Sequence, residues 1–167
     1  RQSDLKEFEA RIPKILDQLG LNYIFWLVEQ SEDNQEFNKG RLINIGYLES
    51  QKHDSTNNYY CVHDVDIFPE TTTAIKYDYY DRVYNAYGST ARLGGIFFLD
   101  KKAWERSNGF SNNYWGWGSE DNDFIWRIRQ EAGDNGPLVL DNSDVKAGIN
   151  THEAKKQGKK PGLKDIY

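Results

Sequence analysis

Residues 112–123 read Asn-Asn-Tyr-Trp-Gly-Trp-Gly-Ser-Glu-Asp-Asn-Asp, and the rest of the chain is expected to fold around this stretch. Glycines that alternate with tryptophans let the backbone bend while two large rings wall a pocket. The carboxylates that follow open an apolar pattern of helical spacing from Phe124. We therefore expect Glu120 and Asp121 at a helix N-terminus, where negative charge is favourable, facing the space that the tryptophans enclose. An acidic helix cap beside buried tryptophans is the alternative interpretation.

Composition indicates one globular domain over residues 1–167. The net charge of −5 and an isoelectric point near 5.2 argue against broad electrostatic binding of nucleic acid. The single cysteine, Cys61, excludes an internal disulfide framework. No apolar run approaches the roughly 20 residues that a membrane span requires. Because the chain starts at Arg1 and contains no Met, we expect a first strand and any anchor to precede it, and a mobile basic tail over residues 146–167.

Apolar periodicity predicts helices alternating with short buried strands. Helices are expected at residues 4–20, at 37–50, after the capping residue Asp100, and from 120 to about 133. Strands are expected at residues 23–28, 59–62, 94–99 and 138–140. The continuous apolar run at residues 23–28 suits a strand buried on both faces, as in a parallel α/β sheet. Residues 70–91 have no clear period and are expected to be irregular.

A second acidic motif, His63-Asp64-Val65-Asp66, directly follows the strand predicted at residues 59–62. Alternation along an extended chain would put Asp64 and Asp66 on one face and Val65 on the other. Carboxylates at the C-terminal end of a strand in an open α/β sheet lie where such folds bind ligands. Their hard oxygens suit Mn²⁺ or Mg²⁺ and, through the ion, a diphosphate, although such a pair also occurs by chance.

These motifs, in this order, resemble the β-1,4-galactosyltransferases, and most of all the branch that builds the proteoglycan linker on xylose. The resemblance covers nearly the whole chain, and it rests on residues 63–66, Gly94-Gly95, Asn108-Gly109-Phe110, the Trp-Gly-Trp-Gly-Ser-Glu-Asp run at 115–121, and Phe-Asn-Lys-Gly-Arg-Leu-Ile-Asn-Ile-Gly-Tyr-Leu-Glu-Ser at 37–50. It implies a GT-A glycosyltransferase fold, an α/β domain with a Rossmann-like nucleotide-binding sheet flanked by helices, here in a possibly trimmed version.

The resemblance also implies roles for individual residues. Asp121 would be the catalytic base, and Asp66 and His152 would hold Mn²⁺, with Mg²⁺ as the second choice. The nucleotide would be contacted by Arg1, Phe37, Asp64, Val65 and Trp117. The donor or acceptor sugar would be contacted by Glu120, Trp115, Asn122, Arg92 and Gly95.

The chain departs from the family pattern at its metal ligands, at the acceptor and at the donor. Relatives usually have a further metal ligand two or three residues before His152, where this chain has Asn150 and Ile149, so the ion is expected to be held more weakly or completed by water. Asn122 stands where relatives use an acidic residue to hold the acceptor. Arg92 lies near the place of a Tyr that helps to set donor choice, and could favour a donor that carries a carboxylate.

The resemblance thus implies an inverting, metal-dependent glycosyltransferase that moves a sugar, first of all galactose, from a UDP-sugar to a hydroxyl of a xylose- or N-acetylglucosamine-type acceptor, free or in a glycoconjugate. Two alternatives stay open: a non-catalytic UDP-sugar- or carbohydrate-binding module derived from this fold, and a metal-dependent phosphoesterase. The family would place the full-length protein in the Golgi lumen; without the family, the cytoplasm is the expectation.

Overall fold

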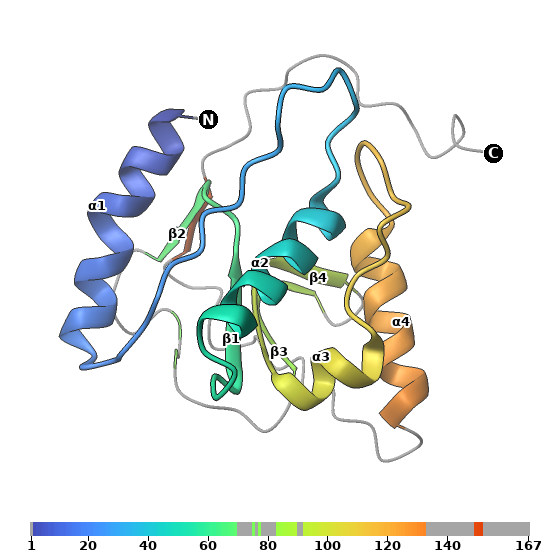
Figure 1. Ribbon diagram of the computed structural model, residues 1–167. Helices are drawn as coiled ribbons and strands as arrows, with labels where there is room; N and C mark the ends of the chain where they lie inside the picture. Colours follow the sequence, from blue (N-terminus) through green and yellow to red (C-terminus); the bar gives the residue numbers. More distant parts are fainter. Residues whose placement is uncertain are drawn as a thin grey trace.

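The computed structural model describes residues 2–69, 83–89, 92–132 and 149–151, together with Ile75 and Tyr77 (Figure 1). The elements follow one another as α1 (Gln2–Gln18), α2 (Lys39–His53), β1 (Tyr59–His63), β2 (Ile67–Pro69), β3 (Tyr84–Ser89), β4 (Arg92–Asp100), α3 (Lys101–Ser107), α4 (Glu120–Ala132) and β5 (Ile149–Thr151).

The described strands pair only in the antiparallel sense. One sheet has the order β1-β4-β3, and a second, two-stranded sheet joins β2 to β5. The parallel sheet expected from the apolar runs is therefore wrong for the described strands. The physical reason lies in the connections, because β3 reaches β4 in too few residues for the crossover that parallel pairing requires.

The irregular structure expected at residues 70–91 is wrong for residues 84–89, which form β3. The sequence there hides the strand because Asn85 interrupts the apolar alternation, yet Asn85 is fully buried. Its side-chain Oδ1 accepts a hydrogen bond from the Gly94 N–H at 3.0 Å, which satisfies a polar atom inside the hairpin. Val83 and Tyr84 are buried beside it.

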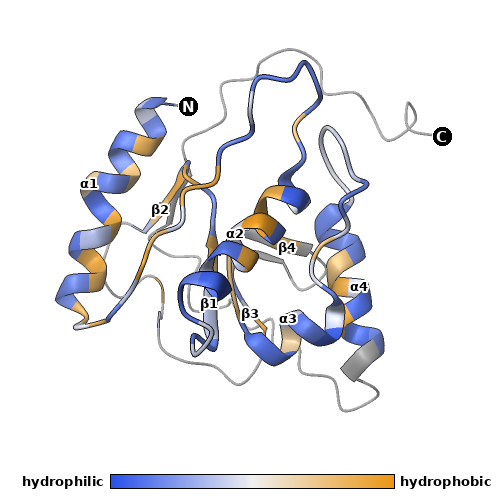
Figure 2. Ribbon diagram, viewed as in Figure 1, coloured by the Kyte–Doolittle hydropathy of each residue, from blue (hydrophilic) through white to orange (hydrophobic). Residues whose placement is uncertain are grey.

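The apolar run at residues 23–28 does not form the buried strand that we expected. These residues have no regular secondary structure, and Ile24 and Leu27 are 55% and 60% exposed. The segment runs over the outside of the molecule between α1 and α2, and Figure 2 shows its apolar character (Figures 1 and 2). Phe25 packs edge-on against Phe8 of α1. No strand in the described part of the chain pairs with it, and hydrophobicity alone does not supply a hydrogen-bonded ladder.

Strand β4 separates two apolar clusters, because its side chains alternate between the two faces of the sheet. Phe97 and Leu99 pack with Trp104 of α3 and Phe124 of α4. Ile96 and Phe98 point to the other face, where they join Ile12 and Leu16 of α1 and Ile67 of β2. The expected strand at residues 94–99 is therefore confirmed, and it forms the centre of the fold.

The predicted helices are confirmed, and so is the cap predicted at Asp100, whereas α2 begins at Lys39 rather than at residue 37 and is capped by Asn38. Asp100 accepts a hydrogen bond from the Ala103 N–H at 2.7 Å and so caps α3. Asn38 does the same for α2, with 2.9 Å to the Arg41 N–H. Helix α4 begins at Glu120, as expected.

Several sequence expectations fall outside the described residues, among them the strand at residues 138–140. Within the tail expected to be mobile from residue 146, Ile149–Thr151 form β5 and pair with β2. The other tail residues lie outside the described part. None of the helices in the described residues is long and apolar enough to cross a membrane.

Candidate active site

Three segments far apart in the sequence meet at one site: the N-terminus of α2, the turn after β1 and the N-terminus of α4 (Figure 1). Lys39, the first residue of α2, has its Nζ atom 3.0 Å from Oδ1 and 3.1 Å from Oδ2 of Asp64. Its charge also interacts with Asp121 and Glu120, which open α4. The two acidic motifs of the sequence therefore face a common site, and one lysine interacts with both.

The Asp64–Asp66 motif forms a turn between β1 and β2 rather than an extended strand. The Asp64 N–H donates to the Gly95 carbonyl at 2.6 Å, and the Ile67 N–H donates to the Asp64 carbonyl at 3.3 Å. The expected alternation of Asp64 and Asp66 on one strand face is therefore wrong. Pairing with β4 holds the chain as far as Asp64, and the next residues reverse direction to begin β2.

Gly95 provides the space in which this turn fits. A Cβ atom at Gly95 would lie 2.0 Å from Cδ1 of Ile67 and 2.8 Å from Oδ2 of Asp64. The close backbone approach expected at this glycine is confirmed, since any side chain would displace the Asp64 carboxylate. A contact between Gly95 and a sugar stays a prediction.

His63 supports the turn from inside the protein. Its Nδ1 lies 2.9 Å from the Asp64 carbonyl, so this nitrogen carries the proton and donates. Its Nε2 is then free to accept from the Tyr77 hydroxyl at 3.5 Å, and Phe8 packs edge-on against the ring. Burial lowers the pKa of His63 to about 4, despite the nearby charge of Asp66. The imidazole is therefore neutral near pH 7 and has a structural role.

Asp121 has the properties of a general base. Its Oδ1 atom is buried and has no hydrogen-bond partner among the described residues. Burial raises the pKa of Asp121 to about 6; Lys39 opposes this increase, and the negative charges of Glu120 and Asp64 add to it. A carboxylate that has one buried oxygen without a partner, and a pKa raised toward neutrality, is suited to accept a proton from a ligand.

The simple capping interpretation of the acidic run does not account for these two residues. A capping carboxylate would accept hydrogen bonds from the first amides of its own helix, whereas Oδ1 of Asp121 accepts none from the described residues. Glu120 is only 8% exposed, although it opens the helix. The tryptophans are not buried either, because Trp115 is 41% and Trp117 63% exposed.

The tryptophan loop rests on the segment that leads into α2. The Gly116 N–H donates to the Phe37 carbonyl at 2.8 Å. Gly116 has a φ of 82°, and a Cβ there would lie 2.7 Å from Oε2 of Glu36, so this position requires glycine. Phe37, predicted to contact the nucleotide, is 47% exposed, and its backbone is hydrogen-bonded to the glycine between Trp115 and Trp117.

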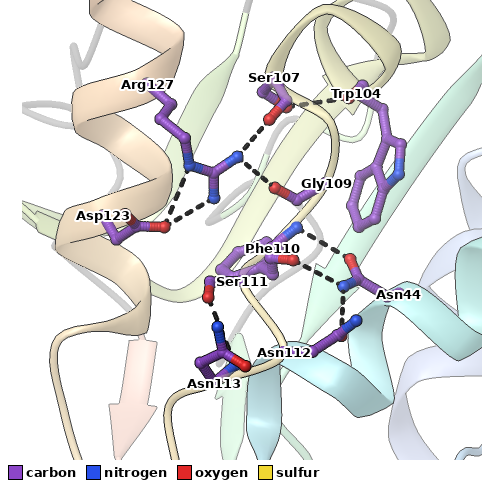
Figure 3. A network of polar contacts seen from close by, with 10 residues as sticks. All are labelled: Asn44, Trp104, Ser107, Gly109, Phe110, Ser111, Asn112, Asn113, Asp123 and Arg127. Atoms are coloured by element: carbon purple, nitrogen blue, oxygen red, sulfur yellow. Dashed lines mark hydrogen bonds and ion pairs between the residues drawn. The ribbon is translucent and has the colours of Figure 1, made fainter.

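Side chains from α2 and α4 hold the start of this loop (Figure 3). Asn44 donates to the Phe110 carbonyl at 2.7 Å and accepts the Phe110 N–H at 2.8 Å. Buried Asn38 donates to the Asn112 carbonyl at 2.8 Å. Hydrogen bonds to the backbone therefore fix the start of the tryptophan loop. They also join the segment at residues 37–50 to the segment at residues 108–121.

The remaining predicted site residues divide into two groups. Val65 and Asp66 lie in the turn beside Asp64, and Asn122 is exposed in the first turn of α4. Arg1 and His152 lie outside the described residues, and for Arg92 the structure describes only the backbone, at the start of β4.

The pairing of β5 bears on the predicted metal ligands. Thr151, which precedes His152 in the sequence, pairs with Ile67, which follows Asp66. Within the described residues, no group of three or more His, Cys, Asp and Glu side chains could hold a metal ion. The ligand set proposed from the sequence includes His152, so it extends beyond those residues.

Sequence reasoning missed Lys39, Asn44 and Asn38 as residues of the site. For Lys39 a signal exists, because a lysine at the first position of a helix opposes the helix dipole and needs nearby anions. The hydrogen bonds of Asn44 to a loop 66 residues away have no local signature.

Comparison with known proteins indicates the class of protein. Residues 1–78 match the N-terminal region of glycosyl transferase group 7, and residues 77–140 match a galactosyltransferase domain described as N-terminal. A crystal structure of Drosophila β1,4-galactosyltransferase 7, in a variant complexed with manganese, UDP-Gal and xylobiose, superposes with a TM-score of 0.75. That match covers 99% of this chain and 74% of the other, at 24% sequence identity. The chain therefore has the GT-A fold of a glycosyltransferase.

Curated relatives define the family more narrowly. Human beta-1,4-galactosyltransferase 4 is 32% identical over 139 residues, which cover 77% of this chain and 39% of the relative. Mouse beta-1,4-galactosyltransferase 7 is 30% identical, and the match covers 77% of this chain and 41% of the mouse protein. The xylosylprotein 4-beta-galactosyltransferase of Caenorhabditis elegans is also 30% identical, and the match covers 77% of this chain and 46% of that protein. This chain belongs to the β-1,4-galactosyltransferase family, and it spans about two fifths of the length of the relatives it matches.

Proposed function

We propose that the chain carries the active site of an inverting, metal-dependent galactosyltransferase, which transfers galactose from UDP-galactose to a hydroxyl of a xylose-type acceptor. The observation that carries the proposal is the buried, unpartnered Oδ1 of Asp121 opposite the Lys39–Asp64 ion pair. The relative named as a xylosylprotein galactosyltransferase and the neighbour crystallised with UDP-Gal and xylobiose support this donor and this acceptor. N-acetylglucosamine-type acceptors are the second choice.

The residues fit a Mn²⁺ ion by the chemistry of their donor atoms. Asp66 offers a carboxylate in a turn that Gly95 holds tightly, and carboxylate and imidazole ligands suit Mn²⁺, with Mg²⁺ second. Asp66 and His152 would hold the ion, and the pairing of Thr151 with Ile67 supports this assignment. When bound, the ion would stabilise the charge of the departing diphosphate.

The residues of the chain supply the rest of the reaction. Asp121 accepts the proton of the acceptor hydroxyl as that oxygen attacks the anomeric carbon from the face opposite the leaving UDP. A single displacement inverts the anomeric configuration and needs no protein nucleophile. The exposed rings of Phe37 and Trp117 flank the nucleotide, with Asp64, Val65 and Arg1 as its other proposed contacts.

The sugars are assigned to the residues around the base. Glu120, Trp115 and Asn122 lie on or before the first turn of α4 and are proposed to hold the acceptor or the donor sugar. Gly95 and Arg92 on β4 complete this proposed set. The membership of the family also makes the Golgi lumen our proposed compartment for the full-length protein.

A second candidate, a UDP-sugar-binding module without transfer activity, is favoured by one observation. Ile149 and Asn150, where relatives have a further metal ligand, are paired in β5 with Pro69 and Phe68. An assay of UDP release from UDP-galactose with Mn²⁺, run with and without a xyloside, separates the candidates. The transferase releases UDP only with acceptor and forms a β-linked product. A binding module binds UDP without sugar transfer, and a phosphoesterase hydrolyses UDP-galactose without acceptor.

The substitution Asp121→Asn tests the assigned base directly. It keeps the size and shape of the side chain but cannot accept the proton, so transfer is expected to fall by about 10²–10⁴-fold. UDP and Mn²⁺ should still bind with unchanged affinity, as measured by titration calorimetry. Undiminished transfer by this variant would reject Asp121 as the base.

A further inference from the structure

The side chain of Gln30 holds the backbone that leads into α2. Its Nε2 donates to the Glu36 carbonyl at 3.0 Å, and its Oε1 accepts the Asn38 N–H at 2.9 Å. A carbonyl on one side and an N–H on the other also decide which end of the amide group lies where. One side chain therefore satisfies a backbone group on each side of Phe37.

Side-chain hydrogen bonds matter here because residues 31–37 form neither helix nor strand and are all exposed. Such a segment opens easily unless hydrogen bonds fix its ends. The Asp33 carboxylate accepts the Gln35 N–H at 3.0 Å, but this bond lies within the tip of the segment. Gln30 makes two bonds that fix its base, at residues 36 and 38.

The backbone that Gln30 holds also supports the tryptophan loop. The Gly116 N–H donates to the Phe37 carbonyl at 2.8 Å. The side chain of Asn38, a residue that is 1% exposed, donates to the Asn112 carbonyl at 2.8 Å. A shift of this backbone would therefore displace the loop at two points. Gln30 thus fixes where the loop lies relative to the Phe37 ring.

We propose that Gln30 is a positioning residue for the donor nucleotide, which holds the Phe37 ring and the tryptophan loop at the spacing that the nucleotide requires. The inference rests on the proposed function, in which Phe37 and Trp117 flank the nucleotide, and deepens it. Gln30 takes no part in the bond changes and acts only through this backbone. A binding surface that is already in place loses less conformational freedom when the ligand binds. The loss of Gln30 should therefore weaken nucleotide binding more than the chemical step.

Two variants separate this role from a general effect on the loop. Gln30→Met removes both hydrogen bonds and keeps the length of the side chain. Gln35→Met is the matched control, because it makes the same substitution at an exposed residue of the same segment. Circular dichroism verifies that each variant folds.

The first readout needs neither nucleotide nor metal. Amide hydrogen exchange followed by NMR reports the opening of the Gly116 N–H, which is bonded to the Phe37 carbonyl. In Gln30→Met this exchange should become faster by about tenfold, and in Gln35→Met it should match the parent. The amides of α1 should exchange as in the parent in both variants. Unchanged exchange of Gly116 in folded Gln30→Met, or equally faster exchange in α1, would overturn the proposal.

The second readout concerns the nucleotide. Titration calorimetry should show that Gln30→Met binds UDP with Mn²⁺ about tenfold more weakly, whereas Gln35→Met binds it as the parent does. In transfer assays KM for UDP-galactose should rise by a similar factor, with kcat within about twofold of the parent. A general loss of folded protein would instead lower kcat and leave KM as it is.

A double-mutant cycle tests whether the effect passes through Phe37. Phe37→Leu removes the ring and keeps the backbone, so in that background Gln30→Met should weaken UDP binding by only about threefold or less. Losses that add fully would overturn the route through Phe37. If the parent protein binds no UDP, the proposed function fails, and hydrogen exchange alone decides whether Gln30 positions the loop. If the parent binds UDP and Gln30→Met binds it equally well, the role of Gln30 in nucleotide binding is rejected.

Discussion

Arg127 and Asp123, one turn apart on α4, form a two-point ion pair, with Nε 3.0 Å and Nη2 2.7 Å from the same oxygen, Oδ2 (Figure 3). The remaining nitrogen of the guanidinium group, Nη1, donates to the carbonyls of Gly109, at 2.6 Å, and of Ser107. The arginine therefore fastens the helix that carries Asp121 to the turn that begins the tryptophan loop.

We expect Arg127→Met to lower the free energy of unfolding by about 2–4 kcal/mol, because it removes charge-assisted hydrogen bonds and leaves partly buried carbonyls and Asp123 without their partner. Urea denaturation followed by tryptophan fluorescence measures the change. Arg106→Met, at an exposed arginine of α3, is the control and should change stability by less than about 0.5 kcal/mol. Equal effects of the two substitutions would contradict the stabilising role of the hydrogen bonds that Arg127 donates.

Gly95→Ala should damage the turn at residues 64–66, which is proposed to bind the metal, more than the fold. A methyl group there meets Ile67 at 2.0 Å and the Asp64 carboxylate at 2.8 Å, so the turn must shift. We expect a loss of about 1–3 kcal/mol in stability and at least about a tenfold weaker binding of UDP with Mn²⁺. Titration calorimetry measures the binding.

Gly46→Ala is the matched control for that substitution. Gly46 lies inside α2, where an added Cβ meets only one flexible methyl group, Cγ2 of Val28, at 3.2 Å. Alanine also favours the helix over glycine by about 1 kcal/mol. Stability should therefore stay level or rise, and UDP should bind as before. Weakened UDP binding in Gly46→Ala would show that the effect at Gly95 is not specific to the turn.

The pKa of Asp121 predicts an unusual dependence of stability on pH. The folded-state pKa is about 6, above the ordinary value of 3.8, so the folded protein holds this proton more tightly than the unfolded chain does. The contribution of Asp121 to stability therefore falls as the pH rises from about 4 to 6. Asp121→Asn removes the charged form and should be more stable than the parent above pH 6, by about 1–3 kcal/mol.

Chemical denaturation of both proteins at pH 4 and pH 7.5 tests this expectation. The difference between parent and Asp121→Asn should be larger at the higher pH. A variant that is less stable than the parent at pH 7.5 would mean that the carboxylate has a stabilising partner, and Asp121 would then be a structural residue rather than a base.

Removal of the metal should abolish both UDP affinity and transfer, since Asp66 and His152 are proposed to bind the diphosphate through the ion. EDTA should inhibit transfer, and added Mn²⁺ should restore it. Asp66→Asn should raise the Mn²⁺ concentration that gives half-maximal activity by about tenfold or more. Asp33→Asn, at an exposed carboxylate, is the control and should behave as the parent. Full activity of Asp66→Asn at the same Mn²⁺ concentration would remove Asp66 from the ligand set.

The local features of the chain could be predicted from the sequence because they depend on neighbouring residues. The cap at Asp100, the start of α4 at Glu120 and the buried strand at residues 94–99 follow from short-range hydrogen bonding and from apolar pattern. The family motifs, likewise, pointed to the acidic residues 63–66 and to the tryptophan-containing stretch at residues 112–123.

The tertiary structure alone decided which of these features meet, and in which form. The apolar run at residues 23–28 is exposed because a strand needs a partner as well as hydrophobic side chains. Asp64 and Asp66 lie in a turn because β4 pairs the chain only as far as Asp64. Lys39 became a site residue only when packing brought α2, the turn and α4 together, since electrostatic interactions depend on distance in space and not on separation in sequence.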